Sequence, residues 1–131
     1  TSTFSKFNLK NKWLNYKAKL FNSTVNEMIK NIEISKTVTL KKIIEQKKIK
    51  KIDLVKIDTE GHELEVLKGL GKKISVIGHI LIEFHHDTIY QSYKPNKVHN
   101  YLIKNNFELE KIYSFPFTTW EDRFYVNRKK K

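Results

Sequence analysis

Residues 53–69, DLVKIDTEGHELEVLKG, decide the predicted fold, because a short apolar strand runs directly into an acidic turn and then into an amphipathic helix. At such a junction the end of a strand meets the exposed amides of a helix N-terminus, and α/β proteins usually bind ligands there. Asp58, Glu60, His62 and Glu63 all lie at this junction. The sequence therefore predicts that the chemistry of the protein takes place at this point.

The flanking sequence continues the alternation of strands and helices. Thr39 is a suitable N-cap for the first helix, Gly69 and Gly71 are suitable breakers for the second, and Pro95 suits the first turn of the third. The apolar run over 76–84 is typical of a central strand buried on both faces. We expect helices over 40–48, 60–70 and 92–105, strands over 52–57 and 76–84, and an antiparallel pair of strands over 107–113 and 123–127. The predicted fold class is α/β, with a parallel sheet that ends in a hairpin.

The chain divides into three parts by composition. Residues 1–35 are irregular and polar, with a helix predicted around 25–32 from the spacing of Val25, Met28, Ile29 and Ile32. Residues 36–128 form the α/β core, and residues 129–131 are a basic tail. The first residues contain neither an initiator Met nor a signal-peptide core, so we expect a longer chain from which this is an interior piece.

Composition narrows the class of protein. A chain of 131 residues with 39% hydrophobic content is suited to one globular domain. It has no cysteine, which excludes disulfides and fits a reducing, cytoplasmic compartment. The longest apolar stretch, 74–84, is too short to span a bilayer, so no membrane partner is predicted. The net charge of +12 comes almost entirely from lysine, whereas nucleic-acid readers favour arginine, so no nucleic-acid partner is predicted either.

The acids of the junction allow a structural and a chemical interpretation. Acids in the first turn of a helix gain roughly 0.3–1 kcal/mol each from the helix dipole, and Asp58 or Thr59 can cap the helix. Capping does not require so many acids together with a glycine and a histidine within six residues. Glu83 ends the next predicted strand and must be paired or solvated, since an unpaired buried charge is costly. Because neighbouring parallel strands end at one edge, Asp58 and Glu83 should line one acid/base site with His62 and His85.

A metal centre is the other chemical interpretation of these side chains. None of them forms a diagnostic spacing such as HExxH, so no metal ligand is assigned. A histidine beside a carboxylate is better suited to accept a proton from a hydroxyl. His79 and His99 are expected to be structural or surface residues. The side chains that could ligate a metal are Asp58, Glu60, His62, Glu83, His85 and His86.

Several motifs resemble the C-terminal half of FkbM-type methyltransferases. They are IDLVKIDTEGHELEVLKG at 52–69, ILIEFHH at 80–86, the Lys-Asn-Asn-Phe turn at 104–107, TVTLKKII at 37–44 and STFS at 2–5. The resemblance implies an S-adenosylmethionine-dependent O-methyltransferase with a Rossmann-like class I sheet. Its acceptor would be a hydroxyl of a sugar, a glycan or a secondary metabolite.

The resemblance also implies roles for residues and a missing part. Asp58 and Glu60 would lie beside the methyl-transfer centre, with Asp58 and Thr59 contacting the cofactor. His62, Glu83 and His85 would handle substrate or proton, and the identity of the base stays open. The family's Gly-rich loop and ribose-binding acid have no counterpart here, and Lys41 stands where related sequences commonly have Asp.

The expected chain is accordingly a partial methyltransferase domain that binds S-adenosylmethionine weakly by itself, with the missing N-terminal half as a partner. The alternative is a non-catalytic or degenerate α/β module that binds a small polar ligand or a partner at the same edge.

Overall fold

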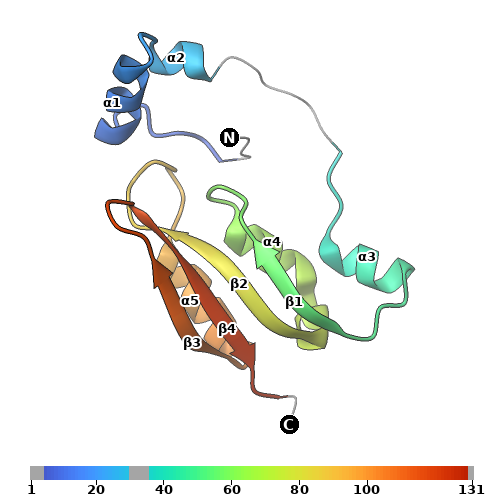
Figure 1. Ribbon diagram of the computed structural model, residues 1–131. Helices are drawn as coiled ribbons and strands as arrows, with labels where there is room; N and C mark the ends of the chain where they lie inside the picture. Colours follow the sequence, from blue (N-terminus) through green and yellow to red (C-terminus); the bar gives the residue numbers. More distant parts are fainter. Residues whose placement is uncertain (1–4, 30–35, 130–131) are drawn as a thin grey trace.

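A four-stranded mixed sheet forms the centre of the protein (Figure 1). The computed structural model describes residues 5–29 and 36–129 of the chain. The strand order is β1-β2-β4-β3, with β1 and β2 parallel and the other two pairs antiparallel. The strands are β1 (Ile52–Ile57), β2 (Ile77–His85), β3 (Phe107–Ser114) and β4 (Trp120–Asn127). The α/β class and the closing hairpin are confirmed, but among the described strands only β1 and β2 form a parallel pair.

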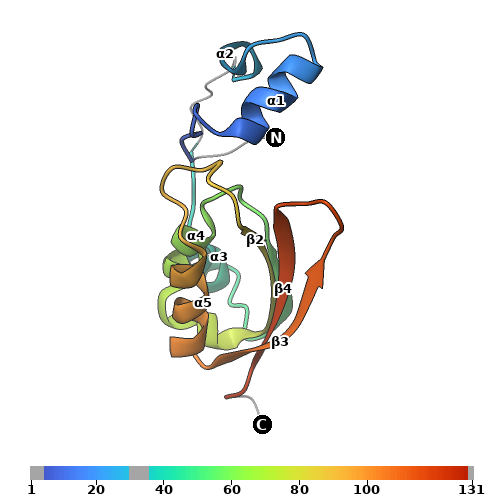
Figure 2. The same cartoon turned by 90° about the vertical axis from the view of Figure 1, so that its left-hand side faces the viewer.

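Three helices cover one face of this sheet, as the side view in Figure 2 shows. They are α3 (Leu40–Gln46), α4 (Glu63–Leu70) and α5 (Pro95–Lys104), with a 3-10 helix η1 (Gly71–Val76) leading from α4 into β2. Because β1, α4, η1 and β2 follow one another along the chain, they form a crossover between two parallel strands. The junction at residues 53–69 is the first part of this crossover, and it runs from β1 into α4 on the covered face of the sheet.

The hydrophobic core lies between the sheet and these helices. Alternate residues of β2, namely Ile80, Ile82 and Phe84, are fully buried against Leu67 and Leu70 of α4. Side chains alternate between the faces of a strand with a period of two, so these three point to the same side. The prediction that β2 is central is confirmed.

The prediction that β2 is buried on both faces is wrong. His79, Leu81 and Glu83, on the other face, are only partly buried. The three helices lie on the opposite side, so this face is left partly accessible (Figure 2).

The acidic turn before α4 differs from the prediction. Helix α4 begins at Glu63 rather than at Glu60, because Glu60 and Gly61 have positive φ angles of 53° and 93°, which are incompatible with a right-handed helix. The N-cap position is His62, without a side-chain cap, so neither Asp58 nor Thr59 caps the helix. At the other end Gly71 is the C-cap, as predicted, whereas Gly69 lies inside the helix.

The remaining element boundaries agree with the prediction to within a few residues. Thr39 caps α3 by accepting a hydrogen bond from the Lys42 amide, and Pro95 is the first residue of α5. The predicted start of α5 at 92 is too early, since residues 92–94 belong to the preceding loop. Strand β4 begins three residues earlier than 123, because Trp120 already pairs with His85 of β2.

The N-terminal segment contains two short helices, α1 (Lys12–Leu20) and α2 (Val25–Met28). The helix predicted around 25–32 is confirmed over 25–28, and its last residues lie outside the described part of the chain. Helix α1 was not predicted, because Trp13, Tyr16 and Leu20 are exposed and only Leu14 and Ala18 are buried, so its apolar residues form no single stripe. No helix in the described ranges has the length and hydrophobicity needed to cross a bilayer.

Candidate functional site

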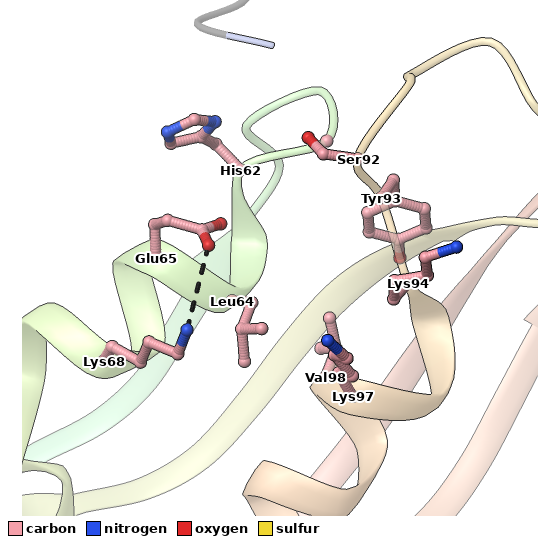
Figure 3. A pocket seen from close by; sticks show the side chains of 10 residues that line it. His62, Leu64, Glu65, Lys68, Ser92, Tyr93, Lys94, Lys97 and Val98 are labelled. Carbon is pink, nitrogen blue, oxygen red and sulfur yellow. Dashed lines mark ion pairs between the residues drawn. The ribbon is translucent and has the colours of Figure 1, made fainter.

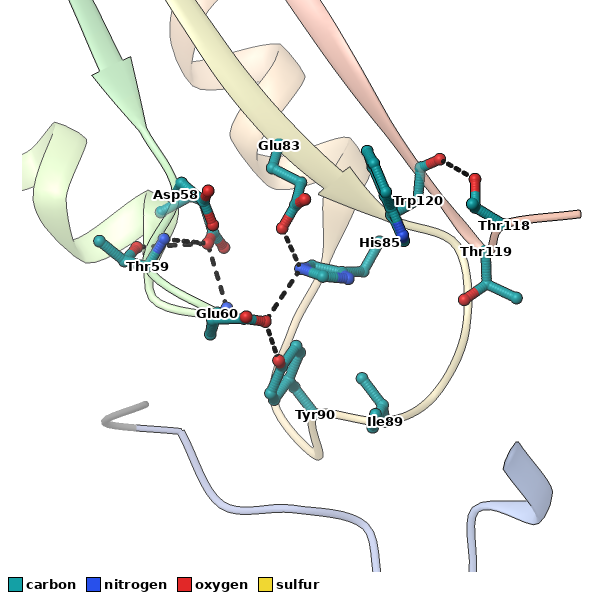
Figure 4. A network of polar contacts seen from close by, with 12 residues as sticks. Asp58, Thr59, Glu60, Glu83, His85, Ile89, Tyr90, Thr118, Thr119 and Trp120 are labelled. Carbon is teal, nitrogen blue, oxygen red and sulfur yellow. Dashed lines mark hydrogen bonds and ion pairs between the residues drawn. The ribbon is translucent and has the colours of Figure 1, made fainter. Parts of the chain in front are cut away.

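The carboxyl ends of β1 and β2 lie side by side. Ile57 pairs with Ile82 in the parallel register, so Asp58 and Glu83 follow at neighbouring positions on the same edge. The sequence prediction that these strand ends are neighbours is therefore confirmed. This arrangement places the acidic turn directly beside the end of the central strand (Figure 4).

A buried histidine lies between two carboxylates at this edge. The Nε2 atom of His85 is 3.0 Å from Oε2 of Glu83 and 3.7 Å from Oε2 of Glu60, and His85 is only 7% exposed. Figure 4 shows the three side chains converging from β2 and from the turn after β1. We call Glu60, Glu83 and His85 the acid–histidine cluster.

Tyr90 completes this network, and sequence reasoning missed it. Its hydroxyl donates a hydrogen bond to Oε2 of Glu60, and its ring lies edge-on to the His85 ring at 5.0 Å. It belongs to the polar loop after β2, 30 residues from Glu60, so no local spacing indicated the contact. The left-handed backbone conformation of Glu60 turns its side chain toward this loop. The contact with Tyr90 therefore explains why this strained conformation is kept.

The other predicted site residues lie around the acid–histidine cluster. Asp58 is partly exposed and its carboxylate is 3.0 Å from the ammonium of Lys56. The imidazole of His62 does not join the cluster, and its Nδ1 lies 3.1 Å from the Ser5 hydroxyl of the N-terminal segment. Thr59 donates both its amide and its hydroxyl to Glu63.

Glu63 has a structural role rather than a chemical one. It is fully buried, and its Oε1 accepts hydrogen bonds from the amides of Thr59 and Gly61, each at 3.1 Å, and from the Thr59 hydroxyl at 3.2 Å. A buried carboxylate that accepts several donors holds a turn firmly. Glu63 therefore fixes the turn that presents Glu60 to His85.

The electrostatic surroundings of His85 raise its pKa. Burial by itself lowers the pKa of an imidazole, but the hydrogen bond and charge of Glu83, together with the charge of Glu60, outweigh burial. Burial and the bond to Glu60 raise the pKa of Tyr90, so its hydroxyl stays a neutral donor. The cluster can thus hold a proton on His85, or accept one when His85 is neutral.

The raised pKa of His85 predicts a pH-dependent stability. A group whose pKa is higher in the folded state stabilises the fold fully below its unfolded pKa, about 6.5, and loses this contribution as the pH rises through the folded pKa. We expect the difference in free energy of unfolding between wild type and His85→Gln to decrease from pH 6 to pH 9. Urea unfolding at several pH values measures it. A difference that stays constant or increases with pH would contradict the assignment.

The acid–histidine cluster also brings ligand atoms close enough for a metal ion, all within 4.8 Å of one another. A metal ion and a proton compete for the same nitrogen of a histidine. A histidine held between two carboxylates is also suited to accept and hold a proton, which is the chemistry expected from the sequence.

A pocket of about 240 Å³ opens beside the cluster, between the start of α4 and the start of α5 (Figure 3). Gly61 and Tyr93 line it, and the ring of Tyr93 also packs edge-on against His85 at 5.7 Å. Its charged lining residues are Glu65, Lys68, Lys94 and Lys97. We call it the lysine pocket.

The two histidines expected to be structural bond to groups outside the site. Nδ1 of His79 lies 2.8 Å from the Asp53 carbonyl oxygen, and Nδ1 of His99 lies 2.9 Å from the Tyr125 hydroxyl. His86 pairs with Glu121 at 3.1 Å on a more exposed part of the edge. Of the predicted candidates, only Glu60, Glu83 and His85 therefore form the cluster.

Comparison with known proteins identifies the family of the chain. The sequence model of the methyltransferase FkbM domain matches residues 4–109, most of the chain. The chain belongs to the FkbM methyltransferase family. This confirms the resemblance found in the sequence and supports an enzyme of the methyltransferase class.

A curated relative gives a more specific likeness. The FkbM-family chain is 38% identical over 50 residues to the hexuronic acid methyltransferase AglP of Haloferax volcanii, a stretch covering 38% of this chain and 21% of the relative. The matched stretch thus spans about a fifth of that relative's length. No solved structure matches the chain significantly.

The described residues do not by themselves build a site for S-adenosylmethionine, the cofactor that methyltransferases of this kind imply. Asp58 and Thr59 stand at the end of β1, but no Gly-rich turn follows a strand within residues 5–29 and 36–129. The amides of Thr59 and Gly61, which a cofactor could use, already donate to Glu63.

Proposed function

We propose that this chain forms the acceptor side of an S-adenosylmethionine-dependent O-methyltransferase with a Rossmann-like sheet. The observation that carries the proposal is the acid–histidine cluster at the shared edge of β1 and β2. Family membership supports methyl transfer, and the parallel crossover supports the Rossmann-like arrangement. A partner that contributes the other half of the domain would bind most of the cofactor.

The acceptor is a hydroxyl of a sugar or glycan, and we favour an acidic sugar. The support is the likeness to AglP, whose name gives a hexuronic acid as its substrate. A sugar hydroxyl is a poor nucleophile at neutral pH, so a base that removes its proton during the transfer accelerates the reaction. The cofactor supplies the activated methyl group.

His85 is the proposed base. Its neutral imidazole accepts the hydroxyl proton, and Glu83, whose Oε2 lies 3.0 Å from Nε2, stabilises the imidazolium that forms. Glu60, held by Tyr90, adds a second negative charge beside that imidazolium. Since the pKa of His85 is raised, its neutral form gains population above about pH 6.5, and the rate should rise with pH there.

Asp58 and His62 line the approach to the cluster rather than acting as the base. Asp58 lies at the end of β1 with a partly exposed carboxylate, which suits contact with the cofactor or the acceptor. His62 lines the lysine pocket, which suits contact with the acceptor. Thr59 is the second residue at the cofactor side by resemblance.

Asp58→Asn and Glu83→Gln test the proposal in the full chain supplied with the rest of its domain. We expect each to lower methyl transfer roughly a hundredfold or more, because transition-state charge and proton transfer depend on these carboxylates. Radiolabelled methyl transfer measures the rate, and circular dichroism checks that the fold is intact.

The matched control is Glu110→Gln, which removes the same charge from an exposed residue of β3. It should leave the transfer rate unchanged. Undiminished turnover in both Asp58→Asn and Glu83→Gln would rule out the proposed site.

A further inference from the structure

The lysine pocket adjoins the acid–histidine cluster but has the opposite charge. Gly61, which lines the pocket, is the neighbour of Glu60 in the chain, and Tyr93 separates the pocket from His85. The pocket and the cluster therefore lie at the same edge of the sheet, with the Tyr93 ring between the pocket and His85. Figure 3 shows the pocket between α4 and α5.

Few carboxylates in the described part of the chain neutralise the lysines of the pocket. Lys68 lies 4.0 Å from Glu65, at the limit of an ion pair, with both side chains about half exposed. Neither Lys94 nor Lys97 forms an ion pair with a residue in the described ranges. The pocket thus has three lysines against one glutamate and attracts anions.

The start of α5 adds to this attraction. The helix begins at Pro95, and its N-cap residue, Lys94, makes no side-chain hydrogen bond to the first turn. The positive end of the helix dipole and the lysines therefore act on the same space.

The acids of the site repel an acidic acceptor, and the lysine pocket offsets this repulsion. Asp58, Glu60 and Glu83 repel a substrate carboxylate, so the cluster alone disfavours a uronic acid over a neutral sugar. A cationic pocket beside the cluster offsets the repulsion and orients the sugar ring, because the carboxylate and the reacting hydroxyl then occupy different sites.

We propose that the lysine pocket binds the carboxylate of an acidic sugar, with Lys94 and Lys97 as the residues that select for it. The proposal rests on the proposed function, since it names the acceptor class of that same site. A volume of about 240 Å³ suits one charged group or a sugar ring rather than an oligosaccharide.

Binding of simple sugars to the full chain tests the proposal without cofactor or turnover. The probes are methyl glucuronide, methyl glucoside and inorganic phosphate, and the readout is the NMR-detected dissociation constant at low salt. We expect the glucuronide to bind about tenfold more tightly than the glucoside, and Lys94→Gln/Lys97→Gln to remove this preference.

The control variant Lys12→Gln/Lys17→Gln removes the same charge from exposed positions of α1 and should keep the preference. Equal affinity for the two glycosides, no binding of either at millimolar concentration, or an equal loss in the control would overturn the proposal. Phosphate that displaces the glucuronide at equal concentration would show a general anion site and overturn the assignment to a sugar acid.

The two proposals can fail separately. Methyl transfer to neutral sugars with no preference for the glucuronide would leave the proposed function intact and contradict the pocket. Selective binding of the glucuronide by a chain that transfers no methyl group in its complete domain would support the pocket and contradict the enzyme.

Discussion

Glu63→Ala will lower the free energy of unfolding by about 3–5 kcal/mol, the loss expected when the buried charged partner of several donors is removed. The change deletes the acceptor of three hydrogen bonds and leaves the amides of Thr59 and Gly61 buried without that partner. Because these bonds shape the turn after β1, the variant will also release Glu60 from its position beside His85. Guanidinium unfolding measures the stability.

Two further variants separate this effect from a change of charge in α4. Glu65→Ala removes a half-exposed glutamate from the same first turn and should cost less than about 1 kcal/mol. Glu63→Gln keeps an oxygen that can accept from the same donors, so it should cost less than the alanine variant. A loss below about 1 kcal/mol for Glu63→Ala would contradict the structural role of the buried carboxylate.

Gly61→Ala will lower the free energy of unfolding by about 2–4 kcal/mol. A Cβ at this position would lie 2.7 Å from Cγ of Tyr90 and 2.9 Å from Oγ of Ser5, and the φ angle of 93° disfavours any side chain. The substitution should push Tyr90 away from Glu60 and thereby loosen the acid–histidine cluster. Thermal and denaturant unfolding measure the stability, and the fluorescence of the chain reports movement of aromatic rings.

Gly69→Ala is the matched control for this substitution. Gly69 lies inside α4, and an added Cβ would meet only Thr39 at 3.5 Å, an ordinary contact. Alanine favours a helix interior over glycine by roughly 0.5–1 kcal/mol, so this variant should be slightly more stable than wild type. Equal effects of the two substitutions would show that the turn at Gly61 is not tightly packed against Tyr90.

The order and type of the elements in the α/β core were predictable from the sequence. The strand over 52–57 matched the observed β1, and the strand over 76–84 shifted by only one residue in β2. Apolar periodicity, Thr39, Pro95 and Gly71 are local signals, and each acts within a few residues of the boundary that it sets. Helix α1 has an N-cap in Asn11, but most of its large apolar side chains are exposed, so no apolar periodicity indicated the helix.

The candidate site was predictable only in part. The strand ends at Asp58 and Glu83 followed from the parallel arrangement, and His85 followed from its place two residues after Glu83. Tyr90 and the lysine pocket did not follow, because they join residues about 30 positions apart through a loop without regular periodicity. Glu63 was expected only as one of the acids at the junction, and its burial makes it a structural acceptor.

The sequence by itself determined the strand–turn–helix junction at 53–69, the family resemblance and the edge of the sheet where polar residues gather, since these depend on local pattern and strand direction. The tertiary structure decided the functions of the acids within that junction. Glu60 turns toward His85 and Tyr90, Asp58 pairs with Lys56, and Glu63 is buried beneath the turn. The reason is that burial and distant partners, rather than residue type, determine whether a carboxylate stabilises a turn or takes part in proton transfer.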